Sequence, residues 1–335
     1  MVTVWTAAAA AIAFAITAIL GKWAIPFLHK INFEQTIRES GPTWHRKKNG
    51  TPTMGGFLFI IGIIAACAVC IPFYYRRKGE NPLVMAMNTK LTGGILMACG
   101  FGLTGFLDDF IKVIKKRNLG LNVRQKLILQ FLVAGGYLYS LYRAGSGNKT
   151  LVPFFGAVDL GIWYWVIALF GIVGMVNAVN FTDGIDGLNA SVTFFVALSF
   201  LAAAGILRIE PVGILAAAVA GGCLGFLVWN FNPAKVFMGD TGSLFLGGLV
   251  CALGFALNIP VLLLPIGIVY IVEILSVVLQ VSYFKITHGK RLFKMSPIHH
   301  HFELCGWSEV KICAVFSLVT ILFGAGAVFL VAYGF

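Results

Sequence analysis

Residues 229–244 read WNFNPAKVFMGDTGSL, a short polar stretch between two apolar segments at 212–229 and 241–257. The amides and proline of Asn230–Pro233 are typical of a helix end, and the small residues of Gly239–Ser243 are typical of the start of the next helix. Asp240 stands at that start, where backbone N–H groups favour anions and a carboxylate can bind a hard cation. A simple N-cap is the alternative role for Asp240.

The composition predicts a polytopic membrane protein. The chain has 335 residues, of which 59% are hydrophobic and 11% charged, and its mean hydropathy is +0.90. No soluble domain can bury that much apolar surface. We therefore expect an all-α protein with one transmembrane domain over residues 1–335. By the hydropathy rule about ten segments span the bilayer, at 4–28, 55–73, 88–106, 127–142, 161–179, 189–207, 212–229, 241–257, 260–284 and 312–333.

The basic residues predict the orientation of the chain. Ten spans divide the loops into two sets, and one set carries seventeen Lys and Arg: Lys30, Arg38, Arg46, Lys47, Lys48, Lys112, Lys115, Lys116, Arg117, Arg124, Lys126, Lys235, Lys285, Lys290, Arg291, Lys294 and Lys311. The other set carries seven: Arg76, Arg77, Lys78, Lys90, Arg143, Lys149 and Arg208. The positive-inside rule places the first set in the cytoplasm and both termini outside. The cluster Arg76–Lys78 is a local exception that the sequence does not explain.

The net charge of +12 fits basic loops at an anionic membrane surface. It does not indicate nucleic-acid binding, because the chain has no basic, aromatic-rich soluble domain.

Two acidic motifs lie in the loops predicted to be cytoplasmic. Asp108–Lys112 reads DDFIK, and its adjacent carboxylates repel each other unless a bound cation or Lys112 compensates them. Asn177–Leu188 reads NAVNFTDGIDGL, whose amides and carboxylates can bind sugar hydroxyls, a nucleobase edge or a metal. The alternatives are a solvated helix end for the first motif and a tight turn for the second.

Three further stretches combine polar groups with membrane segments. Glu273 and Gln280 share one face of the ninth segment, where an acid needs a partner or a watery cavity. Ser296–Glu303 reads SPIHHHFE. Consecutive histidines on a helix point in different directions, which disfavours a shared metal ion. Hydrogen bonds from the imidazoles to phosphate are therefore an alternative to a metal-binding tract. Gly41–Gly56 reads GPTWHRKKNGTPTMGG, a loop whose basic cluster faces either phosphate or lipid.

Taken in order, GTPTMGG, DDFIK, NFTDGIDGL, FMGDTGSL and SPIHHHFE resemble the phospho-N-acetylmuramoyl-pentapeptide transferase family. That family belongs to the polyprenyl-phosphate N-acetylhexosamine-1-phosphate transferases. The resemblance covers essentially the whole chain. The aspartate motifs are shared by the superfamily, whereas the Lys48–Gly56 loop and the histidine triplet are more specific to the muramoyl branch.

The resemblance implies a reaction at the cytoplasmic face of the bacterial inner membrane. UDP-N-acetylmuramoyl-pentapeptide and undecaprenyl phosphate would react, with Mg²⁺, to give lipid I and UMP, the first membrane step of peptidoglycan synthesis. A homodimer is expected from the resemblance alone. An ion-coupled transporter, and a sister enzyme that transfers GlcNAc-1-phosphate, are the alternatives.

The same resemblance implies roles for individual residues. Asp240 would ligate Mg²⁺, and Asp108 and Asp109 would lie beside the lipid phosphate. Asp108 would act as a base, with a covalent aspartyl-phosphate as the alternative. Around the nucleotide-sugar the resemblance places Lys48, Thr53, Asn180, Asp183, Asp186, Asn230 and Phe237.

Phe237 is suited to stack on uracil, and Asp186 is suited to accept a hydrogen bond from its edge. The groups expected to meet phosphates are Lys112, His299, His300 and His301, with Gln280 nearby.

The charge distribution predicts that the loops at Asp108, Asp183 and Asp240 share the cytoplasmic side, because basic residues are concentrated there. Single cysteines placed in these loops should be labelled by an impermeant thiol reagent only from the cytoplasmic side of sealed vesicles. Labelling of any one of them only from outside would overturn the orientation.

Overall fold

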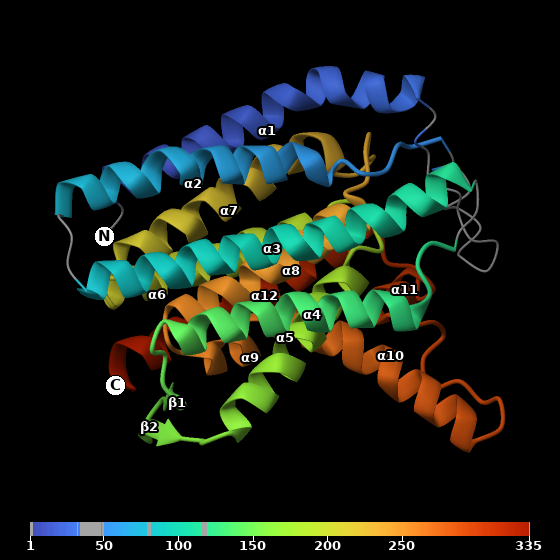
Figure 1. Cartoon of the computed structure of the whole chain (residues 1–335). Coiled ribbons are helices and arrows are strands. Elements are labelled where there is room, and N and C mark those ends of the chain that lie inside the picture. Colours follow the sequence, from blue (N-terminus) through green and yellow to red (C-terminus); the bar gives the residue numbers. More distant parts are fainter. Residues whose placement is uncertain are drawn as a thin grey trace.

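The computed structural model describes residues 3–31, 33, 48, 50–78, 82–115 and 119–334. Long helices form a bundle, and α1 begins and α12 ends at the same end of it (Figure 1). The helices are α1 (Val4–Lys30), α2 (Gly56–Lys78), α3 (Pro82–Ile114), α4 (Val123–Arg143), α5 (Trp163–Thr182), α6 (Leu188–Ile206), α7 (Glu210–Asn230), α8 (Gly239–Ala256), α9 (Leu263–Ile266), α10 (Ile268–Ile286), α11 (Ile298–Glu303) and α12 (Glu309–Tyr333), with a 3₁₀ turn η2 (Pro260–Leu262).

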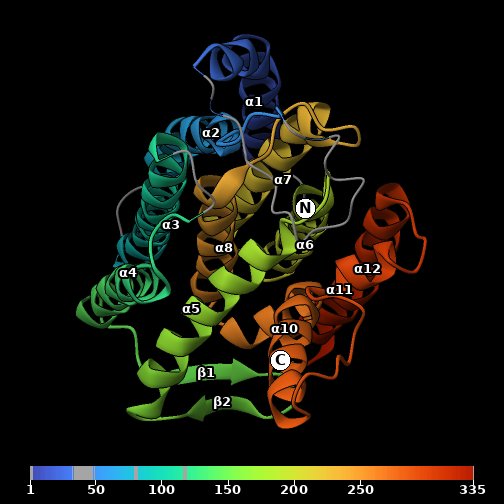
Figure 2. The same cartoon turned by 90° about the vertical axis from the view of Figure 1, so that its right-hand side faces the viewer.

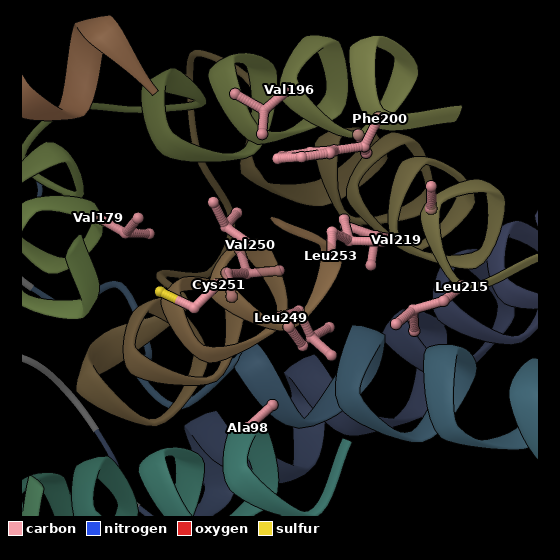
Figure 3. Close-up of a cluster of buried hydrophobic side chains, with 14 of the residues drawn as sticks. Ala98, Val179, Val196, Phe200, Leu215, Val219, Leu249, Val250, Cys251 and Leu253 are labelled. Atoms are coloured by element: carbon pink, nitrogen blue, oxygen red, sulfur yellow. The ribbon is translucent and has the colours of Figure 1, made fainter. Parts of the chain in front are cut away.

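Helix α8 lies at the centre of the bundle. Every residue from Thr241 to Ala256 is buried, and the helix contacts α2, α3, α5, α6 and α7. Figure 2 looks along the bundle and shows α8 between α3, α5 and α7. Figure 3 shows side chains of α8, among them Val250 and Leu253, within the core near Val196 and Phe200 of α6. The site at the start of α8 is therefore held by a helix with no free face.

Small residues let the backbones around α8 approach closely, which is how helices associate in lipid. A Cβ on Gly248 would lie 2.7 Å from the Cα of Ala98 in α3, and one on Gly247 would lie 2.8 Å from the Cα of Val176 in α5. Glycine at these two positions sets the separation of α3 and α5 from α8.

Nine of the described helices are long and apolar enough to cross a membrane, and each overlaps one of the ten predicted segments. The tenth segment, 127–142, is helix α4, whose first turns hold Arg124, Gln125 and Lys126. Helix α3 continues beyond the predicted 88–106 to Ile114, so Asp108 and Asp109 stand on a helix and not in a loop.

The prediction of one continuous helix over 260–284 is wrong, because the helix is interrupted at Gly267. Turn η2 and the one-turn helix α9 precede the break, and α10 follows it. Pro260 and Pro265 account for the interruption, since proline cannot donate a helical hydrogen bond. In Figure 1, α10 leaves the bundle at an angle to the other long helices.

A short β-hairpin is an element of regular structure that the sequence did not predict. Strand β1 (Lys149–Val152) pairs antiparallel with β2 (Gly156–Asp159). The hairpin lies near the end of α12, because Phe154 N donates to Gly334 O at 2.8 Å.

The unexplained basic residue Arg77 has an aromatic partner. Its guanidinium lies 5.7 Å from the ring centroid of Trp5, at the start of α1. A cation over an aromatic face is stabilised there.

The close packing of α8 predicts that Gly248→Ala lowers the melting temperature of the purified protein in detergent. The added methyl group meets backbone atoms of α3, and overpacking of this kind costs about 1–3 kcal/mol. Gly171→Ala in α5 is the matched control, because its Cβ meets no atom within 4 Å. Equal melting temperatures for the two variants would show that α3 and α8 can separate without cost.

Candidate functional site

Asp109 of α3 caps the central helix α8. Its Oδ1 accepts a hydrogen bond from Asp240 N at 3.2 Å, and its Oδ2 accepts from Thr241 N at 2.9 Å and Thr241 Oγ1 at 2.8 Å. Met238 occupies the N-cap position without a side-chain capping bond, and the Asp240 carboxylate is hydrogen-bonded to Lys112, Lys126 and Asn180. The alternative that Asp240 only caps its helix is therefore wrong, and Asp109 has that role.

Asp240 instead faces two lysines and an asparagine. Its Oδ2 lies 3.0 Å from Lys112 Nζ and 2.9 Å from Lys126 Nζ. Its Oδ1 accepts a hydrogen bond from Asn180 Nδ2 at 2.9 Å, and Asn180 also donates to Ser243 Oγ at 2.8 Å. Helices α3, α4 and α5 thus all reach the first turn of α8 through its one carboxylate.

Asp108 completes an acidic cluster with Asp109 and Asp240. Its Oδ1 accepts from Leu121 N at 2.7 Å, and its Oδ2 lies 2.5 Å from Lys112 Nζ. Lys112 is also 3.6 Å from Asp109 Oδ1, so its ammonium contacts all three carboxylates. One oxygen from each acid lies within 4.8 Å of the others, an arrangement compatible with a metal site.

The loop between α5 and α6 brings Asp183 close to this cluster. Burial, followed by the negative charges of Asp240, Asp109 and Asp186, raises the pKa of Asp183 well above its ordinary value. A raised pKa means that a fourth negative charge is disfavoured here, so the loop adds a group that can hold a proton.

A second charged cluster lies on the other side of this loop. Lys48 Nζ is 2.6 Å from Asp186 Oδ1 and 2.7 Å from Glu309 Oε1. Glu309 Oε2 also accepts from Asp186 N at 2.9 Å, and Asp186 Oδ2 accepts from Asn232 Nδ2 at 3.2 Å and Ala234 N at 2.9 Å. The first turn of α12 and the loop before α8 therefore meet at Asp186.

Asn230 and the segment around Thr53 link the two charged clusters by hydrogen bonds to backbone groups. Asn230 Oδ1 accepts from Gly187 N at 3.1 Å, and its Nδ2 donates to Val236 O at 2.9 Å. Phe237 N donates to Pro52 O at 2.8 Å. A Cβ on Gly239 would meet Thr53 Oγ1 and Asp109 Oδ2, so Thr53 lies beside the cap of α8.

The three histidines lie on helix α11 and point in different directions, as their spacing predicted. His299 is fully buried, and its Nδ1 lies 3.1 Å from both carboxylate oxygens of Glu273 in α10. His299 is thus the partner that this buried acid needed. His300 Nδ1 lies 2.6 Å from Glu303 Oε2, and His301 Nδ1 accepts from Lys294 N at 3.1 Å.

His299 approaches the loop between α5 and α6. A Cβ on Gly184 would collide with His299 Nε2, and this nitrogen finds no hydrogen-bond partner among the described residues. Among the described residues, Gln280 makes its hydrogen bonds to the segment after α10 and not to the acidic cluster. Its Oε1 accepts from Leu292 N at 3.1 Å and Phe293 N at 2.8 Å, which anchors the segment after α10.

Three residues of the site were not singled out from the sequence: Lys126, Asn232 and Glu309. Lys126 and Glu309 each occupy the first turn of a helix, after Asn122 and Ser308, which cap α4 and α12. Those capping signals locate the helix starts but not the partners of the charges. Residues 41–47 and 49 of the predicted basic loop lie outside the described residues.

Comparisons with known proteins assign the chain to a family. Residues 91–258 match the model for glycosyl transferase family 4, and residues 48–60 match phospho-N-acetylmuramoyl-pentapeptide-transferase signature 1. A phospho-N-acetylmuramoyl-pentapeptide-transferase of Desulforamulus reducens is 46% identical over 324 residues, covering 96% of this chain and 93% of the relative. The chain belongs to the phospho-N-acetylmuramoyl-pentapeptide-transferase family.

Other members are equally similar along their length. The transferase of Heliobacterium modesticaldum is 46% identical, covering 93% of this chain and 94% of the relative. That of Halalkalibacterium halodurans is 44% identical and covers 95% of each chain. The family's signature includes Lys48 and Thr53.

The Lys48 contacts predict that Glu309→Gln weakens the site. The substitution keeps the shape of the side chain but removes one of the two negative charges that hold Lys48, and a hydrogen bond to a charged group contributes about 1.5–3 kcal/mol. We expect a lower melting temperature and slower transferase turnover. Glu210→Gln, in the first turn of α7, is the matched control. Wild-type behaviour of both variants would show that Asp186 alone suffices to hold Lys48.

Proposed function

We propose that this chain transfers phospho-N-acetylmuramoyl-pentapeptide from its UDP derivative to undecaprenyl phosphate, giving lipid I and UMP. The name of its relatives describes a transferase of this group. The observation that carries the proposal is the convergence of Asp108, Asp109 and Asp240 with Lys112 at one end of an apolar bundle. A charged site in that position can serve one substrate dissolved in water and another anchored in lipid.

We propose that this end of the bundle faces the cytoplasm of a bacterial inner membrane, because the loops there are rich in Lys and Arg. The whole chain would act as one catalytic unit, and by the family resemblance as a homodimer.

The acidic cluster fits Mg²⁺. Carboxylate oxygens are the ligands that this cation prefers. Three carboxylates face two ammonium groups, Lys112 and Lys126, which leaves a surplus of negative charge. Asp240 would hold the ion, with Asp108 and Asp109 beside it. A bound Mg²⁺ would neutralise the diphosphate and favour the departure of UMP.

Asp108 is the acid best placed to act on the lipid phosphate. Among the described residues, Asp109 accepts its hydrogen bonds from the start of α8, so a reaction on Asp109 would uncap the central helix. Asp108 would accept the remaining proton of undecaprenyl phosphate. An oxygen of that phosphate then attacks the sugar-linked phosphorus, and the bond from this phosphorus to UMP breaks.

A covalent route through Asp108 is the alternative. There the carboxylate itself would attack the phosphorus and form an aspartyl-phosphate before the lipid phosphate arrives. Incubating the enzyme with the UDP-sugar but without the lipid distinguishes the routes, since only the covalent route releases UMP under those conditions.

The nucleotide-sugar would bind around the loop between α5 and α6. Lys48, Asn180, Asp183, Asp186 and Asn230 all lie on or contact this region. Phe237 would stack on uracil, and Thr53 would lie at the same side of α8. Lys112, His300 and His301 would contact phosphates, whereas His299, through its contact with Gly184, would support the loop.

The choice of sugar is tested by comparing UDP-N-acetylmuramoyl-pentapeptide with UDP-GlcNAc in the presence of undecaprenyl phosphate. We expect UMP release from the first substrate only. Efficient turnover of UDP-GlcNAc would instead assign the chain to a sister activity, and ion flux without UMP release would indicate a transporter.

The metal assignment predicts that Asp240→Asn lowers the rate of UMP release by orders of magnitude. The amide keeps the shape but loses the charge that binds a hard dication, and charge stabilisation supplies most of the catalysis in phosphoryl transfer. The measurement is a Mg²⁺ titration of the purified variant with a melting curve alongside. Asp159→Asn, in the hairpin at the other end of the bundle, is the control. A near-normal rate with unchanged Mg²⁺ dependence would leave the metal to Asp108 or Asp109.

A further inference from the structure

A cavity of about 540 Å³ lies at the end of the bundle opposite the acidic cluster. It is bounded by the start of α3, the end of α4, the hairpin and the segment after α8. Lys90 lines it, and Lys90 precedes Asp108 by 18 residues on α3, about 27 Å along the helix axis. The cavity is therefore separate from the site described above.

The cavity contains a cation without an anionic partner. Lys90 is partly buried, and its Nζ donates to Asn258 Oδ1 at 2.5 Å. Among the described residues no carboxylate forms an ion pair with it, and the one acid lining the cavity, Asp159, accepts a hydrogen bond from Gly161 N at 2.9 Å. A partly buried lysine without an ion pair loses part of the favourable interaction of its charge with water. A bound anion would supply the missing charge.

Two hydroxyl groups of the lining point to the same kind of ligand. Thr150 is only 8% exposed, and neither its Oγ1 nor Ser146 Oγ has a hydrogen-bond partner among the described residues. Buried polar groups in proteins are nearly always hydrogen-bonded. Lys149 adds a second positive charge to the same lining. The lining thus combines two ammonium groups with two unsatisfied hydroxyl donors.

We propose that this cavity binds a phosphate group. A phosphate offers several acceptor oxygens and a negative charge, which match Lys90 and Lys149 and, once the lining adjusts to the ligand, the buried hydroxyls of Thr150 and Ser146. Leu141, Leu151 and Phe255 form apolar parts of the lining, so the phosphate can belong to the headgroup of an anionic membrane lipid or to a free phosphate ion. The proposal is independent of the transferase reaction.

Binding is measured as the rise in melting temperature of the full-length protein in detergent. The probes are solubilised phosphatidylglycerol, phosphatidylcholine as the zwitterionic lipid, and inorganic phosphate. We expect phosphatidylglycerol to stabilise the wild type more than phosphatidylcholine does. Stabilisation by inorganic phosphate to the same extent would assign the cavity to the free ion, and stabilisation by phosphatidylglycerol alone would assign it to a lipid headgroup.

Substitutions in the lining test whether the stabilising probe binds in this cavity. Lys90→Met should weaken the apparent affinity for the stabilising probe roughly tenfold or more, since it removes a charged hydrogen bond. Thr150→Val gives a second, milder test if Lys90→Met does not fold. Lys22→Met, on the exposed side of α1, is the matched control. All three variants should keep wild-type UMP release, because none touches the acidic cluster.

The proposal is overturned if neither phosphate source stabilises the wild type. It is equally overturned if Lys90→Met and Thr150→Val respond as the control does.

Discussion

The arrangement of the site depends on one interaction, the carboxylate of Asp109 on the free N–H groups at the start of α8. These groups have no partner within their own helix, and a negative charge at a helix start is favoured. The contact fixes where α8 begins relative to α3. It thereby places the side chain of Asp240 between Lys112 and Lys126. Two adjacent aspartates thus have different contacts: Asp109 holds the start of α8, whereas Asp108 is bound to Leu121 N and Lys112.

The loop from Asp183 to Gly187 connects the three groups of polar residues. Burial and the charges of the acidic cluster raise the pKa of Asp183, Gly184 packs against His299, and Asp186 binds Lys48. Glycine at 184 is needed because any side chain would occupy the position of the imidazole. The loop therefore links the three groups through only a few residues.

The sequence predicted the membrane class, nine of the spanning helices and the acids that converge. Apolar segments and charged residues can be identified directly from the order of residues. It did not predict the break at Gly267, since apolar residues continue through 260–284. The hairpin was missed because its strands have four residues each. Lys126 and Glu309 were missed for another reason: a charge in the first turn of a helix looks the same whether it is solvated or paired. The partner of Lys126 is Asp240 of α8 and the partner of Glu309 is Lys48, and these pairs can be recognised only in the folded structure.

The complete burial of α8 has a consequence for how the sequence of this family can change. Peripheral helices such as α1 and α10 present many side chains outward, where one apolar residue can replace another at little cost. On α8 every position from Thr241 to Ala256 is in contact on some side with a neighbouring helix. An accepted replacement there needs a compensating change on α3, α5, α6 or α7. Sequence drift in α8 should therefore be slow and should proceed in correlated pairs, while the outer helices diverge independently.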